Sequence, residues 1–445
     1  MANSYLSRTP GSTTDAQRKQ FTISVWVKRS TLLTGSNHQE VLSAFATDQF
    51  GFRFQGDNKL DIFDYSVSGN NYPLRLVTNR LFRDTSAWYN IVLQVDTPNS
   101  TSSERVKLWV NGVQETSFGT ATYPSQDYTA SWNKNGLHQI GSKAWGNSGN
   151  GSDMFPGYLA HVANVAGSVV APTVFGQTDS TSGIWKFKPP SGVTWGTNGF
   201  HLKFENSGNL GLDSSGNSNT FTVNGNLKQS LSTPSNNYNT WNFNNKYNNM
   251  TISNAGTAIA WQQTSGNAWC ASNLGVGSGK WYWEWKAESE HPEANTWGVM
   301  SVDSTAFTDP KTDSGVWCMN QGVKHNGSNG GSYGSQIDIG NIGMVAVDMD
   351  NGKIWLGENG TWFASGDPAA GSNAMYTNLS GKTVTPFHAD TYSTYTPFSS
   401  YNFGEGRFAT TAISSAGSNG NGSLFEYDVP SGFYALNTKN INTYG

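Results

Sequence analysis

The chain has 445 residues, only 13% of them charged, and a formal net charge of −4 with no basic block, which argues against a nucleic-acid partner. The 17 Trp, 18 Tyr and 23 Phe exclude a disordered chain, because disordered segments lack the aromatic side chains that build a core. No run approaches the roughly 18 apolar residues of a membrane span, so no membrane partner is expected.

The first predicted domain consists of short strands separated by turns. Residues 1–20 are polar, show no signal-peptide segment and are expected to lie along the surface. Residues 21–28 (FTISVWVK) then alternate between apolar and other side chains, as a half-buried strand does. Further strands are predicted at 41–45, 50–54, 60–65, 88–95, 106–110, 137–142 and 157–165. This spacing is typical of a β-sandwich.

Two predicted hairpins share one frame, an apolar strand ending in Asp, a turn, a Lys-Ile/Leu-Trp strand and an Asn-Gly pair. They lie at 91–112 and at 344–362 (MVAVDMDNGKIWLGENGTW). Asn-Gly between apolar runs is a strong hairpin signal, because both turn residues must accept positive φ. Strand alternation predicts that Trp109 and Trp355 lie on the sheet face opposite the inward-pointing residues.

The second predicted domain begins near residue 251 and includes the strand 280–286 (KWYWEWK). The fold class is therefore all-β, with two tandem antiparallel β-sandwiches and an irregular connector. The expected boundaries are 1–185 for the first sandwich, 186–250 for a partly packed connector, 251–410 for the second sandwich and 411–445 for a C-terminal extension. The cysteines, Cys270 and Cys318, are expected to be buried thiols, with a disulfide as the alternative.

Several motifs resemble known families. FTISVWVKRS, WYNIVLQVD, VKLWVNGVQ and GYLAHVANVAG resemble the strands of a laminin G-like (concanavalin A-like) jelly roll. GKWYWE, WGV, the run from Ile342 to Asp348 and NFG closely resemble the SPRY domain, whose β-sandwich binds partners through its loops. GFHLKF, LDSSGN, the connector TPSNNY and the tail YDVPSGFYALNTKN resemble bacteriophage virion proteins, although His161 stands where that module usually carries an acidic residue.

The resemblance implies a structural protein of a virion, assembled in the cytoplasm of a bacterial host. Its place would be a tail fibre, another tail appendage or a head decoration. The implied partners are other virion proteins, further copies of the chain in a homo-oligomer, and host cell-surface glycan.

No catalytic residue is predicted. Glu284, Glu288 and Glu290 fall at even spacing, but the acidic run of jelly-roll glucanases is missing, so they are expected to form a solvated strand face. The histidines show no metal-ligand spacing, and no nucleophile elbow or P-loop occurs. The protein is therefore expected not to be an enzyme. The alternatives are a polysaccharide depolymerase or glucanase on the first sandwich, and a lectin-like adhesin.

Ligand binding by aromatic side chains is the expected site chemistry, because sugar faces stack on exposed aromatic rings. Trp132 and Trp145 flank the Gly/Asn-rich loop 133–150, and Asp153 follows it. In the second domain the candidates around loop 309–336 are Trp317, His325 and Tyr333. No cofactor is expected. Calcium at a sandwich rim near Asp153 is the alternative, because laminin G-like domains often bind it there.

Overall fold

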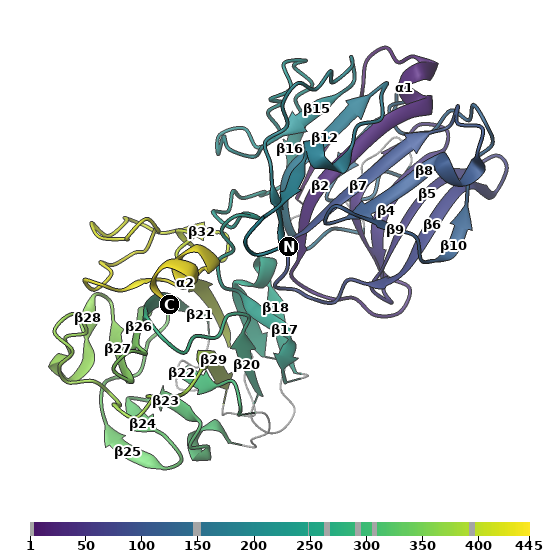
Figure 1. Ribbon diagram of the computed structural model, residues 1–445. Coiled ribbons are helices and arrows are strands. Elements are labelled where there is room, and N and C mark those ends of the chain that lie inside the picture. The colour runs from purple at the N-terminus through teal and green to yellow at the C-terminus, as the bar shows by residue number, and fades with distance from the viewer. Residues whose placement is uncertain are drawn as a thin grey trace. The chain divides into compact units, whose positions relative to one another are not determined.

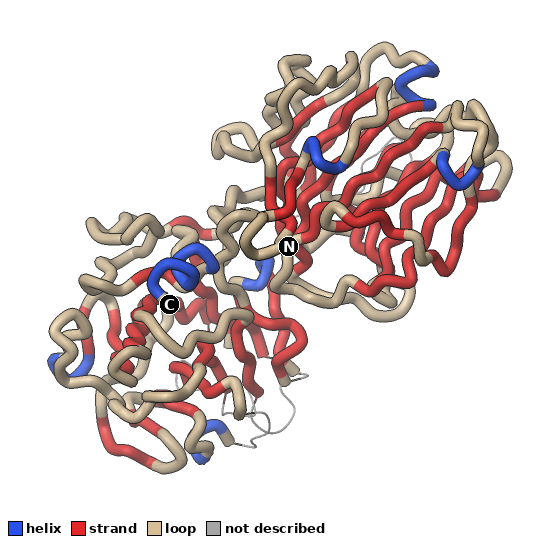
Figure 2. The backbone as a smooth tube through the Cα atoms, viewed as in Figure 1, coloured by secondary structure: helices blue, strands red, loops and turns tan. Residues whose placement is uncertain are grey.

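The computed structural model describes residues 4–145, 153–247, 249–261, 268–289, 295–304, 309–390 and 397–445. The chain forms two compact units, Met1–Gln229 and Ser230–Gly445, called here the first and second units. Strands and loops make up nearly all of both (Figures 1 and 2). The expected all-β class, built of antiparallel sandwiches, is confirmed.

The first unit pairs two large antiparallel sheets. The eight-stranded sheet has the order β10 (Phe118–Thr122), β6 (Asn71–Leu81), β5 (Lys59–Ser66), β4 (Gln49–Gln55), β3 (His38–Phe45), β11 (Leu137–Ile140), β1 (Tyr5–Arg8) and β16 (Thr222–Asn224). The six-stranded sheet has the order β15 (Phe200–Leu202), β12 (Gly157–Ala166), β2 (Gln20–Arg29), β7 (Tyr89–Asp96), β8 (Val106–Val110) and β9 (Val113–Glu115). A small hairpin, β13 (Gly176–Thr178) and β14 (Trp185–Phe187), and the helix α1 (Asp15–Lys19) complete the unit.

The core of the first unit lies between these sheets. Alternate residues of β2, among them Phe21 and Val25, meet alternate residues of β4, among them Phe50 and Phe52, and all four are fully buried. Burial of each such side chain contributes roughly 1.5–3 kcal/mol. The face of each sheet turned away from this core is called its outer face below.

The outer face of the six-stranded sheet is also covered. A second apolar cluster there joins Val92 and Phe175 with Trp109 and Trp195. Trp109 thus lies opposite the inward residues, as predicted, and its indole Nε1 donates to Gln94 Oε1 at 2.8 Å. Residues 170–195 form this cover, so β2 is buried along almost its whole length.

The second unit also pairs two large sheets. One has the order β17 (Trp241–Lys246), β20 (Ala268–Ser272), β29 (Val384–Asp390), β22 (Asn295–Ser301), β23 (Val316–Asn320), β24 (Val323–His325) and β25 (Asn329–Ser332). The other has the order β18 (Met250–Ser253), β19 (Ala258–Trp261), β30 (Phe398–Asn402), β21 (Lys280–Ser289), β26 (Ile342–Asp348), β27 (Lys353–Glu358) and β28 (Thr361–Trp362), with β33 (Tyr434–Ala435) parallel to β21. β31 (Arg407–Phe408), β32 (Thr411–Ala412) and α2 (Thr438–Tyr444) complete the unit. No helix among the described residues is both long enough and apolar enough to cross a membrane.

Two of the three Asn-Gly pairs in the predicted hairpins form the expected tight turn, whereas Asn351 in the third does not take positive φ. Asn359 and Gly360 have φ of 46° and 83°, and Asn111 and Gly112 have φ of 49° and 76°. Positive φ at both positions is the requirement of the tight hairpin turn. Between β26 and β27 the loop is longer, and there Gly352 takes positive φ (65°).

Parts of the chain expected outside the sandwiches belong to them. Within the expected connector, residues 186–229 supply β15 and β16 to the first unit, and residues 230–250 belong to the second unit. Residues 1–20 do more than lie on the surface, since β1 is a strand of the eight-stranded sheet. The C-terminal extension packs in the second unit, where Phe425 and Phe433 join a cluster with Trp355. That cluster is separate from the main core, so Trp355 also lies on the predicted face.

Glu284 corrects the expectation of a solvated acidic face. Its side chain is fully buried, and both carboxylate oxygens accept hydrogen bonds. The backbone N–H groups of Glu426 and Tyr427 each donate at 2.9 Å, Tyr282 Oη donates at 2.9 Å, and Asn402 Nδ2 donates at 3.3 Å. Glu284 therefore holds the C-terminal extension against the sheet. Glu290 lies outside the described residues.

Both cysteines are free and buried, so the expectation of two buried thiols is confirmed. Burial raises the pKa of the Cys270 thiol, and likewise that of Cys318, well above the ordinary range.

We expect Glu284→Ala to lower the free energy of unfolding of the second unit by about 3 kcal/mol, because the four groups that donate to Glu284 lose their acceptor. Urea unfolding and limited proteolysis of residues 411–445 measure the effect. The matched control is Glu288→Gln on the same strand. The Glu288 side chain is 23% exposed, so this substitution should change the free energy of unfolding by less than about 1 kcal/mol. Equal protease resistance of Glu284→Ala and wild type would contradict the proposed anchor.

Candidate functional site

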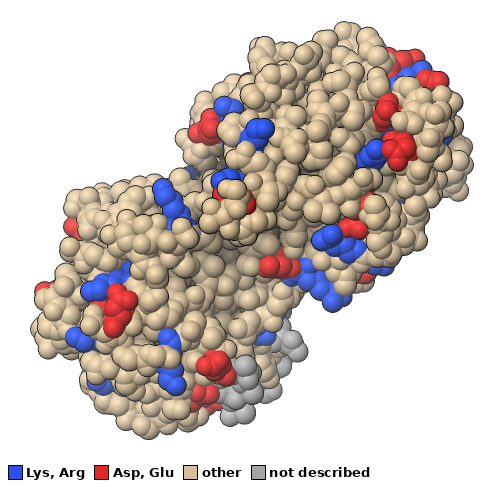
Figure 3. Space-filling view, in the orientation of Figure 1, with Lys and Arg blue, Asp and Glu red and all other residues tan. Residues whose placement is uncertain are grey.

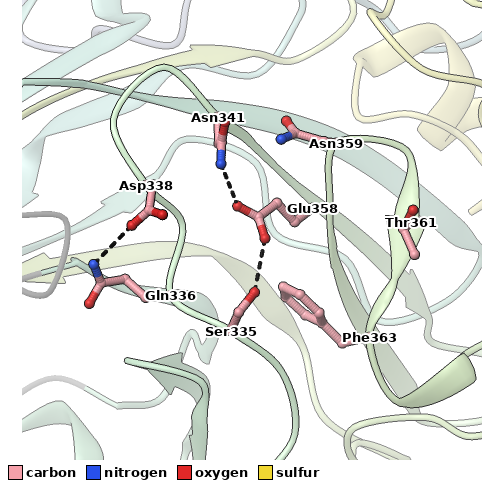
Figure 4. Close-up of a pocket in the computed structure, with 8 residues that line it drawn as sticks. All are labelled: Ser335, Gln336, Asp338, Asn341, Glu358, Asn359, Thr361 and Phe363. Atoms are coloured by element: carbon pink, nitrogen blue, oxygen red, sulfur yellow. Dashed lines mark hydrogen bonds between the residues drawn. The ribbon is translucent and has the colours of Figure 1, made fainter.

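An open depression among the described residues lies on the second unit and has a volume of about 390 Å³ (Figure 4). It is open to solvent. Its lining residues are Ser335, Gln336, Asp338, Asn341, Glu358, Asn359, Thr361 and Phe363. All but Phe363 carry polar side chains, so the depression offers hydrogen bonds around one aromatic ring.

Glu358 lies in the middle of this arrangement. Ser335 Oγ donates to its Oε2 at 2.9 Å, and Asn341 Nδ2 donates to its Oε1 at 2.8 Å (Figure 4). A carboxylate has about four lone-pair sites, so two acceptor sites of Glu358 remain for a ligand. Gln336 Nε2 donates to Asp338 Oδ1 at 3.2 Å, which orients a second carboxylate in the depression.

Two loops place these side chains. The turn between β27 and β28 carries Glu358 at its start and Asn359 at a position of positive φ. Residues 335–341, which precede β26, form the facing wall, and Asn359 Oδ1 accepts from the backbone N–H of Ile342 at 2.9 Å. The turn chemistry of an Asn-Gly hairpin thus sets one side of the depression.

The lining of this depression includes none of the three candidates predicted for the second domain. Trp317 is buried, and its Nε1 donates to Asn378 Oδ1 at 2.7 Å, so it is a core residue and offers no ring face to a sugar. Tyr333 is also buried, but its ring meets Phe363 edge-on at 6.3 Å and so supports the aromatic residue of the lining. His325 is half-buried on β24, and burial lowers its pKa.

The prediction is wrong for Trp132 as an exposed stacking surface. Its indole is fully buried in the first core, packs 5.1 Å from the Phe50 ring and donates to Asn164 Oδ1 at 3.1 Å. Burial of a large apolar side chain lowers the free energy of the folded state by more than ordering of the covering loop raises it.

Trp145 and Asp153 do come together, through Lys143. Trp145 is 41% exposed and its ring packs 5.5 Å from that of Phe45. Lys143 Nζ lies 5.4 Å from the Trp145 ring centre and 3.4 Å from Asp153 Oδ2. The flanks of the loop therefore present an aromatic ring beside an ion pair. Within the described ranges no three His, Cys, Asp or Glu side chains are grouped as a metal site would require, so the calcium alternative gains no ligand set.

Glu40 is a buried acid next to this group. Its backbone N–H donates to the Asp153 carbonyl at 2.8 Å, and its Oε1 accepts from the Phe52 N–H at 3.1 Å. Its Oε2 has no partner in the described structure. Burial raises the pKa of Glu40 to about 8, so the carboxyl is mostly protonated at pH 7.

His161 occupies a bulge in β12, with φ of +48°. Its ring stacks on Phe187 at 3.6 Å, and its Nδ1 lies 3.4 Å from Nε2 of His201. Burial lowers the pKa of His161 to about 3 and that of His201 to about 4, so this pair is neutral at pH 7. The histidines therefore help to hold β14 on the outer face of the six-stranded sheet.

Comparisons with known proteins match parts of the chain. Residues 2–174 match a family described as the concanavalin A-like lectin/glucanases superfamily. This match covers most strands of the first sandwich and agrees with the laminin G-like resemblance of those strands. The chain matches no curated protein.

Two crystal structures of human SPRY domains are similar to part of the chain. The SPRY domain of human HERC1 shares 16% identity with a TM-score of 0.31, covering 36% of this chain and 96% of that one. A second human SPRY domain shares 14% identity with a TM-score of 0.28, covering 35% of this chain and 94% of that one.

Sequence reasoning missed most of the lining. Of this lining, only Ser335 and Gln336 fall within the predicted loop 309–336, and Glu358 falls at a turn of the predicted hairpin 344–362. The available signal was the convergence of an Asn-Gly hairpin with a polar loop immediately before β26, the strand that pairs with β27. In the view of Figure 3, charged side chains are scattered among larger neutral areas, so charge alone does not mark the depression.

We expect Glu40→Gln to match wild type in stability at pH 5 and to exceed it at pH 9. The pKa of Glu40 in the folded state lies above its ordinary value of 4.5. The stability that neutral Glu40 contributes is therefore fully present below pH 4.5 and is lost as the pH rises through 8. Glutamine stays neutral, and each pKa unit corresponds to about 1.4 kcal/mol. Thermal unfolding at pH 5, 7 and 9 tests this, with Glu205→Gln, whose side chain is 73% exposed, as the control.

Proposed function

We propose that this protein is a non-enzymatic binding protein of a bacteriophage particle, and that the depression around Glu358 recognises host cell-surface glycan. The observation that carries the binding role is the lining itself, which combines seven polar side chains with the aromatic ring of Phe363. Sugars need this combination, because their hydroxyls take up directed hydrogen bonds and their C–H faces pack on aromatic rings.

The state of Glu358 supports binding over catalysis. A glycosidase acid is desolvated, and its partner carboxylate stands about 5–10 Å away across a cleft. Glu358 instead lies in an open depression and is held by a hydroxyl and an amide. This is the arrangement of an acceptor that orients a ligand.

The placement on a virion rests on the sequence resemblance of the connector and tail to bacteriophage virion proteins. In such a particle the chain would act as a tail fibre, a tail appendage or a head decoration and would contact neighbouring virion proteins, including its own copies. Labelling of purified particles with an antibody to the chain, imaged by electron microscopy, tests this placement. Absence of the chain from purified particles would favour the lectin-like adhesin.

The binding role is tested on a glycan array with the full-length protein. We expect Glu358→Gln to weaken binding of the recognised glycan by about 10- to 150-fold, because a hydrogen bond to a charged group contributes roughly 1.5–3 kcal/mol. Glu205→Gln on the first unit is the control and should bind as wild type does. If Glu358→Gln bound the glycan as tightly as Glu205→Gln and wild type do, the depression would be ruled out as the binding site.

The enzymatic alternative has a specific supporting observation, since the superfamily matched by the first unit includes glucanases by name. Incubation of the protein with host capsule and laminarin-type glucans distinguishes the binding role from the enzymatic alternative. We expect no release of reducing ends. Turnover that one carboxylate substitution abolishes would overturn the binding role in favour of a depolymerase.

A further inference from the structure

The outer face of the eight-stranded sheet in the first unit carries a charged network. In β4, Phe52 points into the core and Arg53 points outward. Register places Arg53 opposite Asp61 of β5, and Phe63 of β5 opposite Arg75 of β6. Charged and aromatic side chains thus lie side by side across three neighbouring strands.

Asp61 binds both arginines and is itself fully buried. Arg53 donates from Nε and Nη2 to Asp61 Oδ2 at 3.2 and 3.0 Å. Arg75 donates from Nε to Oδ1 at 3.1 Å and from Nη2 to Oδ2 at 3.2 Å. Gln55 adds a further donor to Oδ2 at 3.0 Å. Both guanidinium groups therefore converge on one carboxylate.

Aromatic rings also pack against the guanidinium groups of Arg53 and Arg75. The Arg53 guanidinium carbon lies 4.5 Å from the Phe63 ring centre, and that of Arg75 lies 4.6 Å from the Tyr72 ring centre. A guanidinium fixed by an ion pair and a ring loses little further freedom when it binds a ligand. The network is thus pre-organised for binding an anion.

The network has a surplus of positive charge. Two guanidinium groups face one carboxylate, and Glu40, opposite Arg53 in β3, is mostly protonated because burial raises its pKa to about 8. The hydrogen bonds of both arginines to Asp61 use Nε and Nη2, and the side chains of Arg53 and Arg75 are 10% and 26% exposed. The Nη1 groups take no part in these bonds, and Arg75 is the more accessible of the two arginines.

We propose that this outer face binds a carboxylate-bearing sugar, a hexuronic acid residue of an acidic polysaccharide, through Arg75, with the largely buried Arg53 adding positive charge beside it. The planar guanidinium fork matches a carboxylate. The half-buried Tyr65 ring lies 5.0 Å from that of Tyr72 and extends the aromatic surface beside the arginines, where a sugar ring can pack. The site lies on the first unit and is independent of the depression around Glu358.

The test is titration calorimetry of the full-length protein with tetragalacturonic acid, with a neutral oligosaccharide of equal length and with sodium sulfate. We expect the wild type to bind the uronic acid oligomer, with affinity falling as salt is added. Arg75→Met should weaken this binding at least tenfold. Arg80→Met is the matched control, since Arg80 lies on the same strand but pairs with Glu115.

Arg75→Lys is the second variant, which keeps the charge but loses the fork, and it should also bind several-fold more weakly even if Arg75→Met fails to fold. Circular dichroism checks the fold of each variant. The proposal is overturned if wild type does not bind the uronic acid oligomer, if Arg75→Lys binds it as tightly as wild type, or if sulfate or the neutral oligosaccharide binds equally well. Failure here leaves the depression untouched, because Glu358→Gln tests that site separately.

Discussion

Each unit contains a sheet that is buried on both faces, and the rest of the structure depends on how the second face is covered. β2 and β26 are buried at nearly every position. Neither strand can therefore belong to a simple two-layer sandwich whose outer faces are exposed to solvent. Trp109 and Trp355, which occupy the same place in their hairpins, lie on the second face. A large indole on an exposed sheet face would leave roughly 150–250 Å² of mostly apolar surface in water.

The covers are segments that lie outside the strand pattern of the sandwiches. Residues 170–195 cover Trp109 in the first unit, and residues 425–435 cover Trp355 in the second. The second cover is attached by polar contacts as well as apolar ones, because Glu284 accepts from two of its backbone N–H groups. Residues 170–195 and the C-terminal extension thus act as structural layers, which explains why their sequences contain Phe175, Phe425 and Phe433.

This arrangement decides where ligands can reach the protein. The covered faces are closed, so the two proposed sites lie elsewhere, one where a sheet edge meets loops around Glu358 and the other on the outer face around Arg75. Both places use a carboxylate to orient neighbouring donors. They differ in net charge, since the depression contains two carboxylates and the outer face has an excess of guanidinium groups.

Local chemistry made much of the fold predictable. Strand alternation identified the inward residues, and the Asn-Gly pairs identified two tight turns, because these signals depend only on neighbours in sequence. Burial of the loop aromatics was not predictable in this way. Trp132 and Trp145 flank the same polar loop, yet one is fully buried and the other is 41% exposed, a difference set by distant strands.

The sequence by itself determined an all-β chain of two sandwiches, the positions of the main hairpins and the face on which each hairpin tryptophan lies. Only the tertiary structure decided that Glu284 is buried and that Glu358 meets Ser335 and Asn341. The physical reason is one of range. Side-chain alternation and turn preference act over a few residues, whereas desolvation and hydrogen-bond partners depend on segments up to 143 residues apart, as for Glu284 and Tyr427.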